Sequence, residues 1–143
     1  MTIKQLSIFV ENKPGKLVEA LEALADAKID LRALSLADTA DFGILRVITD
    51  KPEEAQSVMQ EAGFLVKTNE VIPVSVGDKP GGLVAVLRVL ADEGIDVEYI
   101  YAFVAHSRDS AYVILRVTDN NKAIDALKKG NVSILTQEQI YKL

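Results

Sequence analysis

The residues best suited to chemistry in this sequence form a short segment that occurs twice. The first copy is Lys13-Pro14-Gly15-Lys16-Leu17-Val18 and the second is Lys79-Pro80-Gly81-Gly82-Leu83-Val84. In both places an apolar, strand-like stretch precedes the segment, and a pattern of Leu, Val and Ala typical of a helix follows it. A strand-to-helix turn of this kind directs free backbone N–H groups and the positive end of the helix dipole at whatever lies above it. The repeated segment therefore predicts a site for a carboxylate or another small anion.

The composition indicates a soluble globular protein and excludes several classes of function. Of the 143 residues, 49% are hydrophobic and 26% are charged. There is no cysteine, which excludes disulfides, thiolate metal sites and cysteine nucleophiles and is compatible with a cytosol. The net charge is −5 without a basic cluster, so we expect no nucleic-acid partner. No apolar stretch approaches membrane-spanning length and the N-terminus has no apolar leader, so we expect a cytoplasmic protein without a membrane partner.

The elements around the repeated segment follow one order twice. Apolar periodicity predicts, in the first copy, strand 5–10, helix 17–27, strands 29–37 and 43–49 around a turn at 38–41, a helix beginning at 50–54 and ending at Gly63, and strand 64–67. The second copy has strand 71–76, helix 83–93, strands 98–104 and 112–118, helix 122–129, strand 132–135 and a tail, 137–143, that is expected to form a helical turn.

The two copies also match residue by residue. Leu21, Leu24, Ala25, Asp26, Ile29 and Asp30 recur as Leu87, Leu90, Ala91, Asp92, Ile95 and Asp96, and the run 44–47 recurs as 114–117. The spacing of about 66–70 residues is that of a whole small domain. A β-α-β-β-α-β unit is the ferredoxin-like sandwich, with two helices on one face of a four-stranded antiparallel sheet. We predict an α+β protein of two tandem sandwiches, with domains at 1–69 and 70–143.

Two positions test the regularity of the repeat. Gly94 stands where the first helix of the second copy must end, as a left-handed glycine after a helix would. The first copy has Lys28 there, which would cost up to about 1 kcal/mol if it keeps that conformation. Pro73 lies inside a predicted central strand and removes a ladder hydrogen bond, so we expect a bulge or a late strand start there.

Residues for catalysis are sparse. His106 is the only histidine, on the predicted hairpin between 98–104 and 112–118, and it is either a solvated loop residue or a contact to a ligand or partner. No nucleophile–base arrangement, phosphate-binding glycine loop or paired-carboxylate motif is present. We therefore expect no enzyme, no catalytic residue, no metal site and no cofactor.

An aromatic row suggests a contact surface. Tyr99, Tyr101 and Phe103 alternate on one face of a predicted strand, where the first copy has Ala33, Ser35 and Ala37. The row either packs within the chain or forms a subunit contact, since exposed aromatic residues on a sheet face favour association. A homodimer is one expectation from this row.

The whole chain resembles a pair of ACT domains. The resemblance rests on the loops Asn12–Leu17 and Asp78–Leu83, each followed by a Leu/Ala helix ending in Ile-Asp before a strand, and on segment 94–103, which is similar to stand-alone tandem ACT proteins. It implies a regulatory module that binds small ligands, usually amino acids, between paired domains. In that family the first strand–helix loop of one domain and the second strand of its neighbour typically hold the ligand.

Carried over by position, the resemblance implies a site built from two loops and two strands. The glycines let a ligand carboxylate approach the backbone N–H groups, and strand carbonyls can accept from an α-ammonium. The implied ligand-binding residues are Asn12, Lys13, Gly15 and Leu17 with Leu34, Ser35 and Leu36, and Asp78, Lys79, Gly81, Gly82 and Leu83 with Ile100, Tyr101 and Ala102.

A simpler explanation of the same loops stays open. Pro-Gly is good turn chemistry before any helix, and Asn12 and Asp78 could be only helix caps. The copies also differ, since Asp78 replaces Asn12 and Gly82 replaces Lys16. We hypothesise that the two sites are not equivalent and that the second glycine lets a ligand approach the later loop more closely.

The sequence thus favours a non-catalytic binder or sensor of a small amino acid that acts on another protein, such as a regulated enzyme. The alternatives are a ligand-free interaction module or a dimeric regulatory subunit of an amino-acid biosynthetic enzyme. An enzyme built around His106 is a third and weaker alternative, because a lone base lacks catalytic partners.

Overall fold

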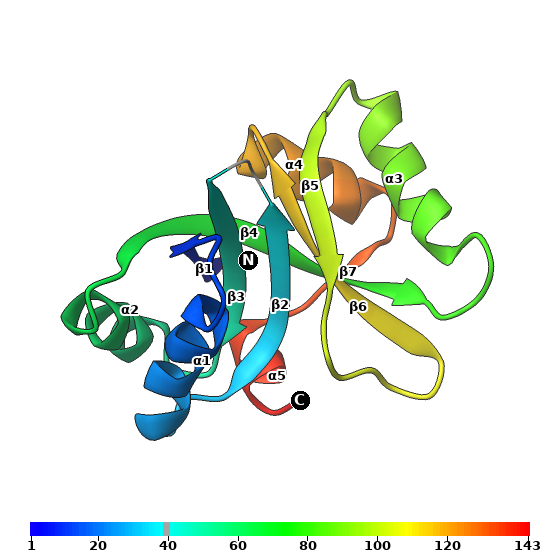
Figure 1. Cartoon of the computed structure of the whole chain (residues 1–143). Helices are drawn as coiled ribbons and strands as arrows, with labels where there is room; N and C mark the ends of the chain where they lie inside the picture. Colours follow the sequence, from blue (N-terminus) through cyan, green and yellow to red (C-terminus); the bar gives the residue numbers. More distant parts are fainter. Residues whose placement is uncertain (39–40) are drawn as a thin grey trace. The chain divides into compact units, whose positions relative to one another are not determined.

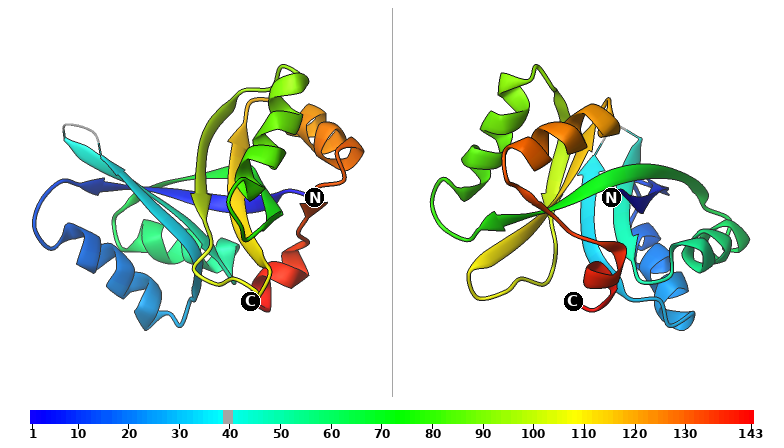
Figure 2. Two further views of the ribbon diagram at one scale, coloured as in Figure 1. Left: turned by 90° about the vertical axis from the view of Figure 1, so that its right-hand side faces the viewer. Right: turned by 180° about the vertical axis from the view of Figure 1, so that it is seen from behind.

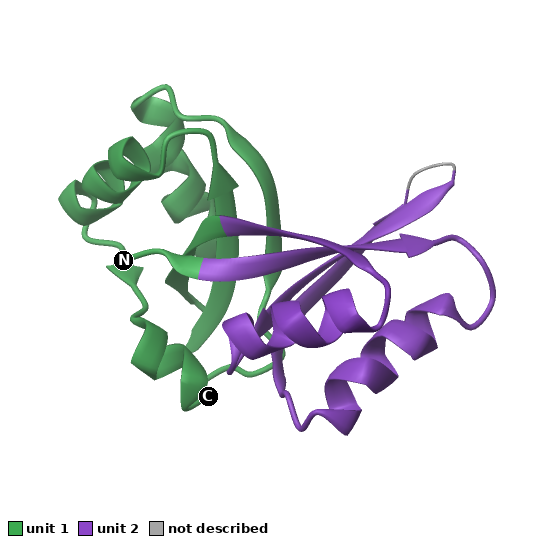
Figure 3. Cartoon of the chain, turned by 90° about the vertical axis from the view of Figure 1, so that its left-hand side faces the viewer, with its two compact units in different colours: residues 1–3, 70–143 green, residues 4–69 purple. Residues whose placement is uncertain are grey.

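The computed structural model describes residues 1–38 and 41–143, which form two compact units (Figure 3). The N-terminal unit comprises residues 4–69, and the C-terminal unit comprises residues 1–3 and 70–143. The predicted turn at 38–41 includes Thr39 and Ala40, which lie outside the described residues. Among the described helices, none combines the length and apolar composition that a membrane crossing requires.

The N-terminal unit has the predicted β-α-β-β-α-β order, shown in Figure 1. Its strand order is β2-β3-β1-β4, and β1 and β2 both pair with β3 in antiparallel register. Both helices lie on one side of the strands (Figure 3) and cover a core that includes Leu6, Ile8, Leu24, Leu45 and Met59. The elements are β1 (Ile3–Glu11), α1 (Lys16–Asp26), β2 (Leu31–Asp38), β3 (Phe42–Thr49), α2 (Pro52–Glu61) and the first residues of β4 (Leu65–Gly77).

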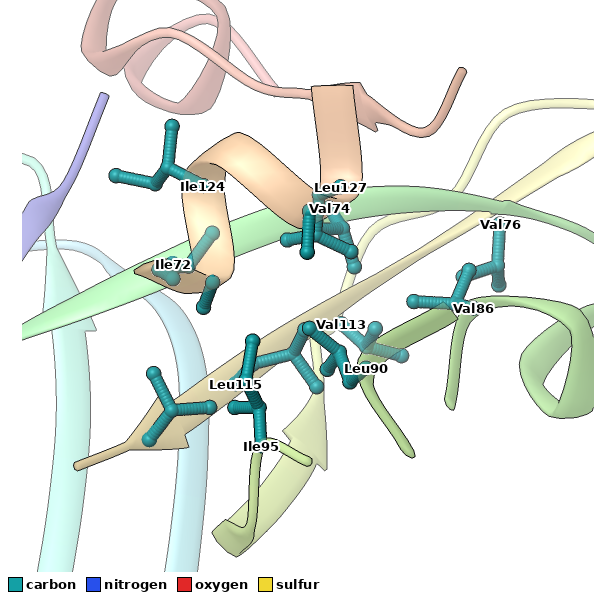
Figure 4. Packing of buried hydrophobic residues seen from close by; sticks show 13 residues of the cluster. Ile72, Val74, Val76, Val86, Leu90, Ile95, Val113, Leu115, Ile124 and Leu127 are labelled. Carbon is teal, nitrogen blue, oxygen red and sulfur yellow. The ribbon is translucent and has the colours of Figure 1, made fainter. Parts of the chain in front are cut away.

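The C-terminal unit repeats this arrangement. Its β4 residues pair with β6 and β7, β6 pairs with β5, and all three pairings are antiparallel. Helices α3 and α4 lie on one face of these strands (Figure 2), and Figure 4 shows their core, in which Ile72 and Val74 meet Leu127. After β4 come α3 (Gly82–Asp92), β5 (Val97–Ala102), β6 (Ser110–Val117), α4 (Asn120–Lys129), β7 (Ser133–Ile134) and α5 (Gln137–Tyr141). The predicted α+β fold of tandem ferredoxin-like sandwiches is confirmed.

Strand β4 differs from the prediction. The sequence suggested separate strands at 64–67 and 71–76, but the structure has one strand of 13 residues that contributes to both units. Pro73 stands in regular register opposite Ile114, so the expected bulge or late start is wrong. The proline ring removes only a donor, and the Pro73 carbonyl still accepts from the Leu135 N–H at 2.8 Å.

The ends of α1 and α3 behave as predicted. Gly94 has a φ of +69° and Lys28 a φ of +61°, so both residues are left-handed. The Gly94 N–H donates to the Ala91 carbonyl, and the Lys28 N–H donates to the Ala25 carbonyl, each at 3.0 Å. The first copy therefore keeps the same helix end at a backbone cost that glycine avoids.

Candidate functional site

The N-terminal loop leads from β1 into α1 through two tight turns. The Lys13 N–H donates to the Glu11 carbonyl at 2.8 Å, and the Lys16 N–H donates to the Lys13 carbonyl at 3.2 Å. Gly15 then takes a left-handed conformation, with a φ of +86°, as the residue before the helix. A Cβ built on Gly15 would meet no atom within 4 Å, so the glycine is required by its backbone conformation rather than by crowding.

The first turn of α1 is uncapped. No side chain accepts a hydrogen bond from the helix start, and within the described residues the N–H groups of Gly15, Leu17 and Val18 have no hydrogen-bond acceptor. The alternative that Asn12 is a helix cap is therefore wrong. Its side-chain amide instead donates to Asp38 Oδ1 at 3.3 Å. Three N–H donors and the positive end of the helix dipole are left open at one place.

The C-terminal loop has the same backbone. The Asp78 N–H donates to the Asp109 carbonyl at 3.1 Å, which matches the bond from the Asn12 N–H to the Asp41 carbonyl at 3.2 Å. Gly81 has a φ of +84°, and α3 also begins without a side-chain cap, so Asp78 is not a cap either. The repeat is therefore one of atomic geometry as well as of sequence.

Gly82 has a different role from the one expected. A Cβ on Gly82 would lie 2.0 Å from the carbonyl oxygen of Gly77, at the end of β4. The space that the missing side chain leaves is thus occupied by the chain itself, and Gly82 is buried. Our expectation that Gly82 opens the later loop to a ligand is wrong, because it is the close approach of α3 to β4 that requires a glycine.

A hollow of about 360 Å³ lies beside the N-terminal loop. We refer to it as the loop hollow. It brings together four predicted site residues from the loop, α1 and β2, namely Asn12, Lys13, Leu17 and Leu36, with Val10, Glu11, Asp38 and Gly43. A second hollow, of about 340 Å³, includes Lys79 and Gly82 of the C-terminal loop.

The predicted strand residues alternate in exposure. Leu34 and Leu36 are 39% and 51% exposed, whereas Ser35 between them is half-buried. Only Leu36 of these three lines the loop hollow. On β5, Ile100 is 37% exposed, Ala102 is exposed and Tyr101 is half-buried. In each unit the first and third of the three predicted residues therefore face outward.

Asp38 and Gly43 were missed by the sequence analysis. They are opposite each other in the β2–β3 register and both line the loop hollow. A Cβ on Gly43 would lie 3.0 Å from Leu36 Cδ1, so the glycine makes room for that leucine. A glycine at the start of a predicted strand was the only available signal.

The charges around the loop hollow form one close pair. Lys13 Nζ lies 3.1 Å from Glu11 Oε2, and this hydrogen bond and charge hold the pKa of the Glu11 carboxyl below its ordinary value. Glu11 therefore remains a carboxylate at neutral pH.

The aromatic row that begins on β5 is half-buried or buried, whereas His106 is exposed. The Tyr99 and Tyr101 rings stack with their centroids 6.4 Å apart, and Phe103 is buried edge-on against Tyr112 at 6.3 Å. These rings are less exposed than the residues between them, which favours the alternative that the row packs within the chain. His106 is exposed, with Nδ1 3.1 Å from the Ser107 carbonyl oxygen.

Comparisons with known proteins agree with this fold. A family model described as an ACT domain pair matches residues 1–143. The crystal structure of protein BT0572 from Bacteroides thetaiotaomicron is 40% identical, with a TM-score of 0.93 over 100% of this chain and 98% of its own. The regulatory subunit of aspartate kinase from Thermus thermophilus, in its ligand-free form, is 18% identical and has a TM-score of 0.64 over 90% and 92% of the two chains. No curated protein matches significantly.

The similarity to the aspartate kinase subunit concerns the fold, and the family match spans the entire sequence. The resemblance seen in the two loops is thereby confirmed, and the chain belongs to the ACT family as an ACT domain pair.

Proposed function

We propose that this protein is a non-catalytic regulator that binds a small amino acid at its strand–helix loops. The observation that supports the proposal best is the pair of uncapped helix starts. Each follows a left-handed glycine, and within the described residues three N–H groups per loop, those of Gly15, Leu17 and Val18 and of Gly81, Leu83 and Val84, have no acceptor. An α-carboxylate supplies the acceptors and the negative charge that such a helix start favours.

The loop hollow suits the remainder of an amino acid. Its volume of about 360 Å³ lies within the range of small-molecule sites. The Asp38 carboxylate and the side-chain oxygen of Asn12 are acceptors for an α-ammonium, and Leu17 and Leu36 offer apolar contact to a side chain. The N-terminal loop is therefore the stronger of the two proposed sites.

A thermal-shift panel of the twenty amino acids tests the proposal. One or a few should raise the melting temperature, because a ligand that binds the folded state stabilises it by mass action. Calorimetry with the best ligand and its carboxamide then tests the carboxylate. The amide should bind about 10–100-fold more weakly, because it loses charge-assisted hydrogen bonds. Equal affinity of acid and amide would contradict carboxylate binding at the helix start.

The output of binding is proposed to pass through another protein, such as an enzyme of amino-acid metabolism, in the cytoplasm. The described residues contain no cluster of three or more His, Cys, Asp or Glu side chains that could hold a metal ion. If a partner enzyme is captured by this protein only in the presence of the identified amino acid, that result would support regulation through another protein.

A second candidate function is an interaction module that acts as a homodimer. The exposed leucines of β2 favour it, because β2 ends the strand order of its unit and an apolar edge strand promotes association. If this is the main role, Leu36→Lys should convert a dimer into a monomer in analytical ultracentrifugation, whereas a monomeric wild-type protein would exclude it.

A further inference from the structure

The loop hollow, proposed above as an amino-acid site, has few charged groups in its lining. Three of its eight lining residues are charged, namely Glu11, Lys13 and Asp38. Which of these charges already has a partner within the protein determines which ligand charges the lining can still neutralise.

Asp38 is the carboxylate of the lining that has no cationic partner. Its Oδ1 accepts a hydrogen bond from Asn12 Nδ2 at 3.3 Å, and no lysine, arginine or histidine of the described residues forms an ion pair with it. Every amino acid carries an ammonium group on the carbon that bears its carboxylate. With the carboxylate at the open helix start, the ammonium group is the natural partner of Asp38.

Lys13 is the cation of the lining, and it already has a partner. Its Nζ lies 3.1 Å from Glu11 Oε2. Once the α-ammonium group has neutralised Asp38, the lining therefore holds no charge without a partner. A charged ligand side chain would lose water there without gaining an opposite charge, which is unfavourable.

The remaining contact surface for a ligand side chain is apolar. Leu17 is half-buried and Leu36 is 51% exposed, and both line the loop hollow. An aliphatic side chain would cover part of this surface and remove it from water.

The C-terminal loop shows that Glu11 is not needed to build the turn. Gly77 stands at the position of Glu11 and Lys79 at that of Lys13. The turn keeps its hydrogen bond, since the Lys79 N–H donates to the Gly77 carbonyl at 2.9 Å, compared with 2.8 Å from Lys13 to Glu11. Among the described residues no carboxylate pairs with Lys79. Glu11 therefore adds a charge to the N-terminal loop without changing the turn.

On the basis of the amino-acid site proposed above, we propose that the N-terminal loop selects an amino acid with an uncharged, aliphatic side chain. Glu11 determines this selectivity, because its carboxylate neutralises Lys13 and so withholds the lysine from an acidic ligand side chain.

Titration calorimetry with L-alanine, L-valine, L-leucine and L-isoleucine, and with L-glutamate and L-lysine, tests the proposal. The best aliphatic amino acid should bind at least about 10-fold more tightly than glutamate or lysine. Tighter binding of glutamate or lysine would overturn the selectivity and leave the amino-acid site standing. Binding of no amino acid would contradict the site itself.

Variants of the ion pair test the role of Glu11. Glu11→Gln leaves Lys13 without its carboxylate and should raise the affinity for glutamate, relative to that for the best aliphatic amino acid, by about 10-fold. The double variant Glu11→Gln with Lys13→Met should lose this gain. An unchanged affinity ratio in Glu11→Gln would overturn the role of the pair.

An ion pair of the same length outside the hollow provides the matched control. Lys4 Nζ lies 3.1 Å from Glu53 Oε1, and neither residue lines the loop hollow. Glu53→Gln removes the same charge and should leave the affinity ratio unchanged. An equal shift in Glu53→Gln would show that overall charge sets the ratio, and would overturn the proposal.

Leu36→Ser tests the apolar contact. It should weaken binding of the best aliphatic amino acid by about 10-fold, because the ligand side chain loses its apolar partner. Circular dichroism melting checks that each variant folds. An unchanged affinity in the folded Leu36→Ser variant would contradict the position of the ligand side chain.

Discussion

The two strand–helix loops share their backbone to a few tenths of an ångström in hydrogen-bond length but differ in what surrounds them. Both have a left-handed glycine at a φ of about +85° and an uncapped helix. At the next position the N-terminal loop has Lys16, whose Nζ lies 3.3 Å from Glu19 Oε2, whereas the C-terminal loop has Gly82, packed against the Gly77 carbonyl. Duplication has thus preserved the turn and its open donors, while the packing of each helix on its strand has changed.

The largest expected effect comes from a substitution that disrupts the packing of α3 against the end of β4. Gly82→Ala places a methyl group within 2.0 Å of a backbone oxygen, which cannot rotate away. We expect a loss of about 3 kcal/mol in the free energy of unfolding, because α3 must shift from β4. Urea unfolding followed by circular dichroism measures it. Lys16→Ala, at the same position of the N-terminal unit, is the matched control and should change stability by less than about 0.5 kcal/mol. Equal effects would mean that the two helix starts are packed alike.

The second prediction compares the two loops as ligand sites. Gly15→Val and Gly81→Val each force a β-branched residue into a left-handed conformation and move the open donors. Since Asn12, Lys13 and Leu17 of the N-terminal loop line the loop hollow, we expect Gly15→Val to lower amino-acid affinity about 10-fold or more and Gly81→Val to lower it less. Calorimetry on both variants decides this. Equal losses would refute the inequivalence of the sites.

The third prediction concerns the helix ends. Lys28 and Gly94 share a left-handed backbone, so Lys28→Gly should stabilise the protein by about 1 kcal/mol and Gly94→Ala should destabilise it by about as much. The shifts in the urea midpoint should have opposite signs. A destabilising Lys28→Gly would show that the lysine side chain compensates for its backbone strain.

The smallest effect is a pH dependence found in the N-terminal loop only. Lys13 lowers the pKa of Glu11 from its ordinary value of 4.5. The C-terminal loop has Gly77 at the position of Glu11, and glycine has no side chain to titrate. A carboxyl whose pKa is lower in the folded state stabilises the protein above its unfolded pKa, and this contribution is lost as the pH falls through the folded pKa. Glu11→Gln should therefore slightly reduce the loss of stability below about pH 4.5, as measured by melting temperature across a pH series. An unchanged pH profile would mean that the pair contributes nothing, as exposed ion pairs often do.

Much of the fold follows from local patterns. The repeated Pro-Gly turn, the helix periodicity and the glycine after α3 predicted the tandem sandwiches, and even the left-handed Lys28, because these features depend on the chain within a few residues. The register of β4 did not follow in the same way. The sequence predicted that Pro73 would disrupt the strand. A missing N–H disrupts a strand only if a carbonyl of the neighbouring strand would have accepted its hydrogen bond, and that depends on which strands lie beside it.

The sequence alone determined the family, the duplicated turn and the left-handed Gly94, since the pattern of neighbouring residues suffices for each. Only the tertiary structure decided that the space at Gly82 is filled by the Gly77 carbonyl while the space at Gly15 is open, and which residues meet in the loop hollow. These depend on atoms that are distant along the chain and brought together by packing, and no local pattern records their separation.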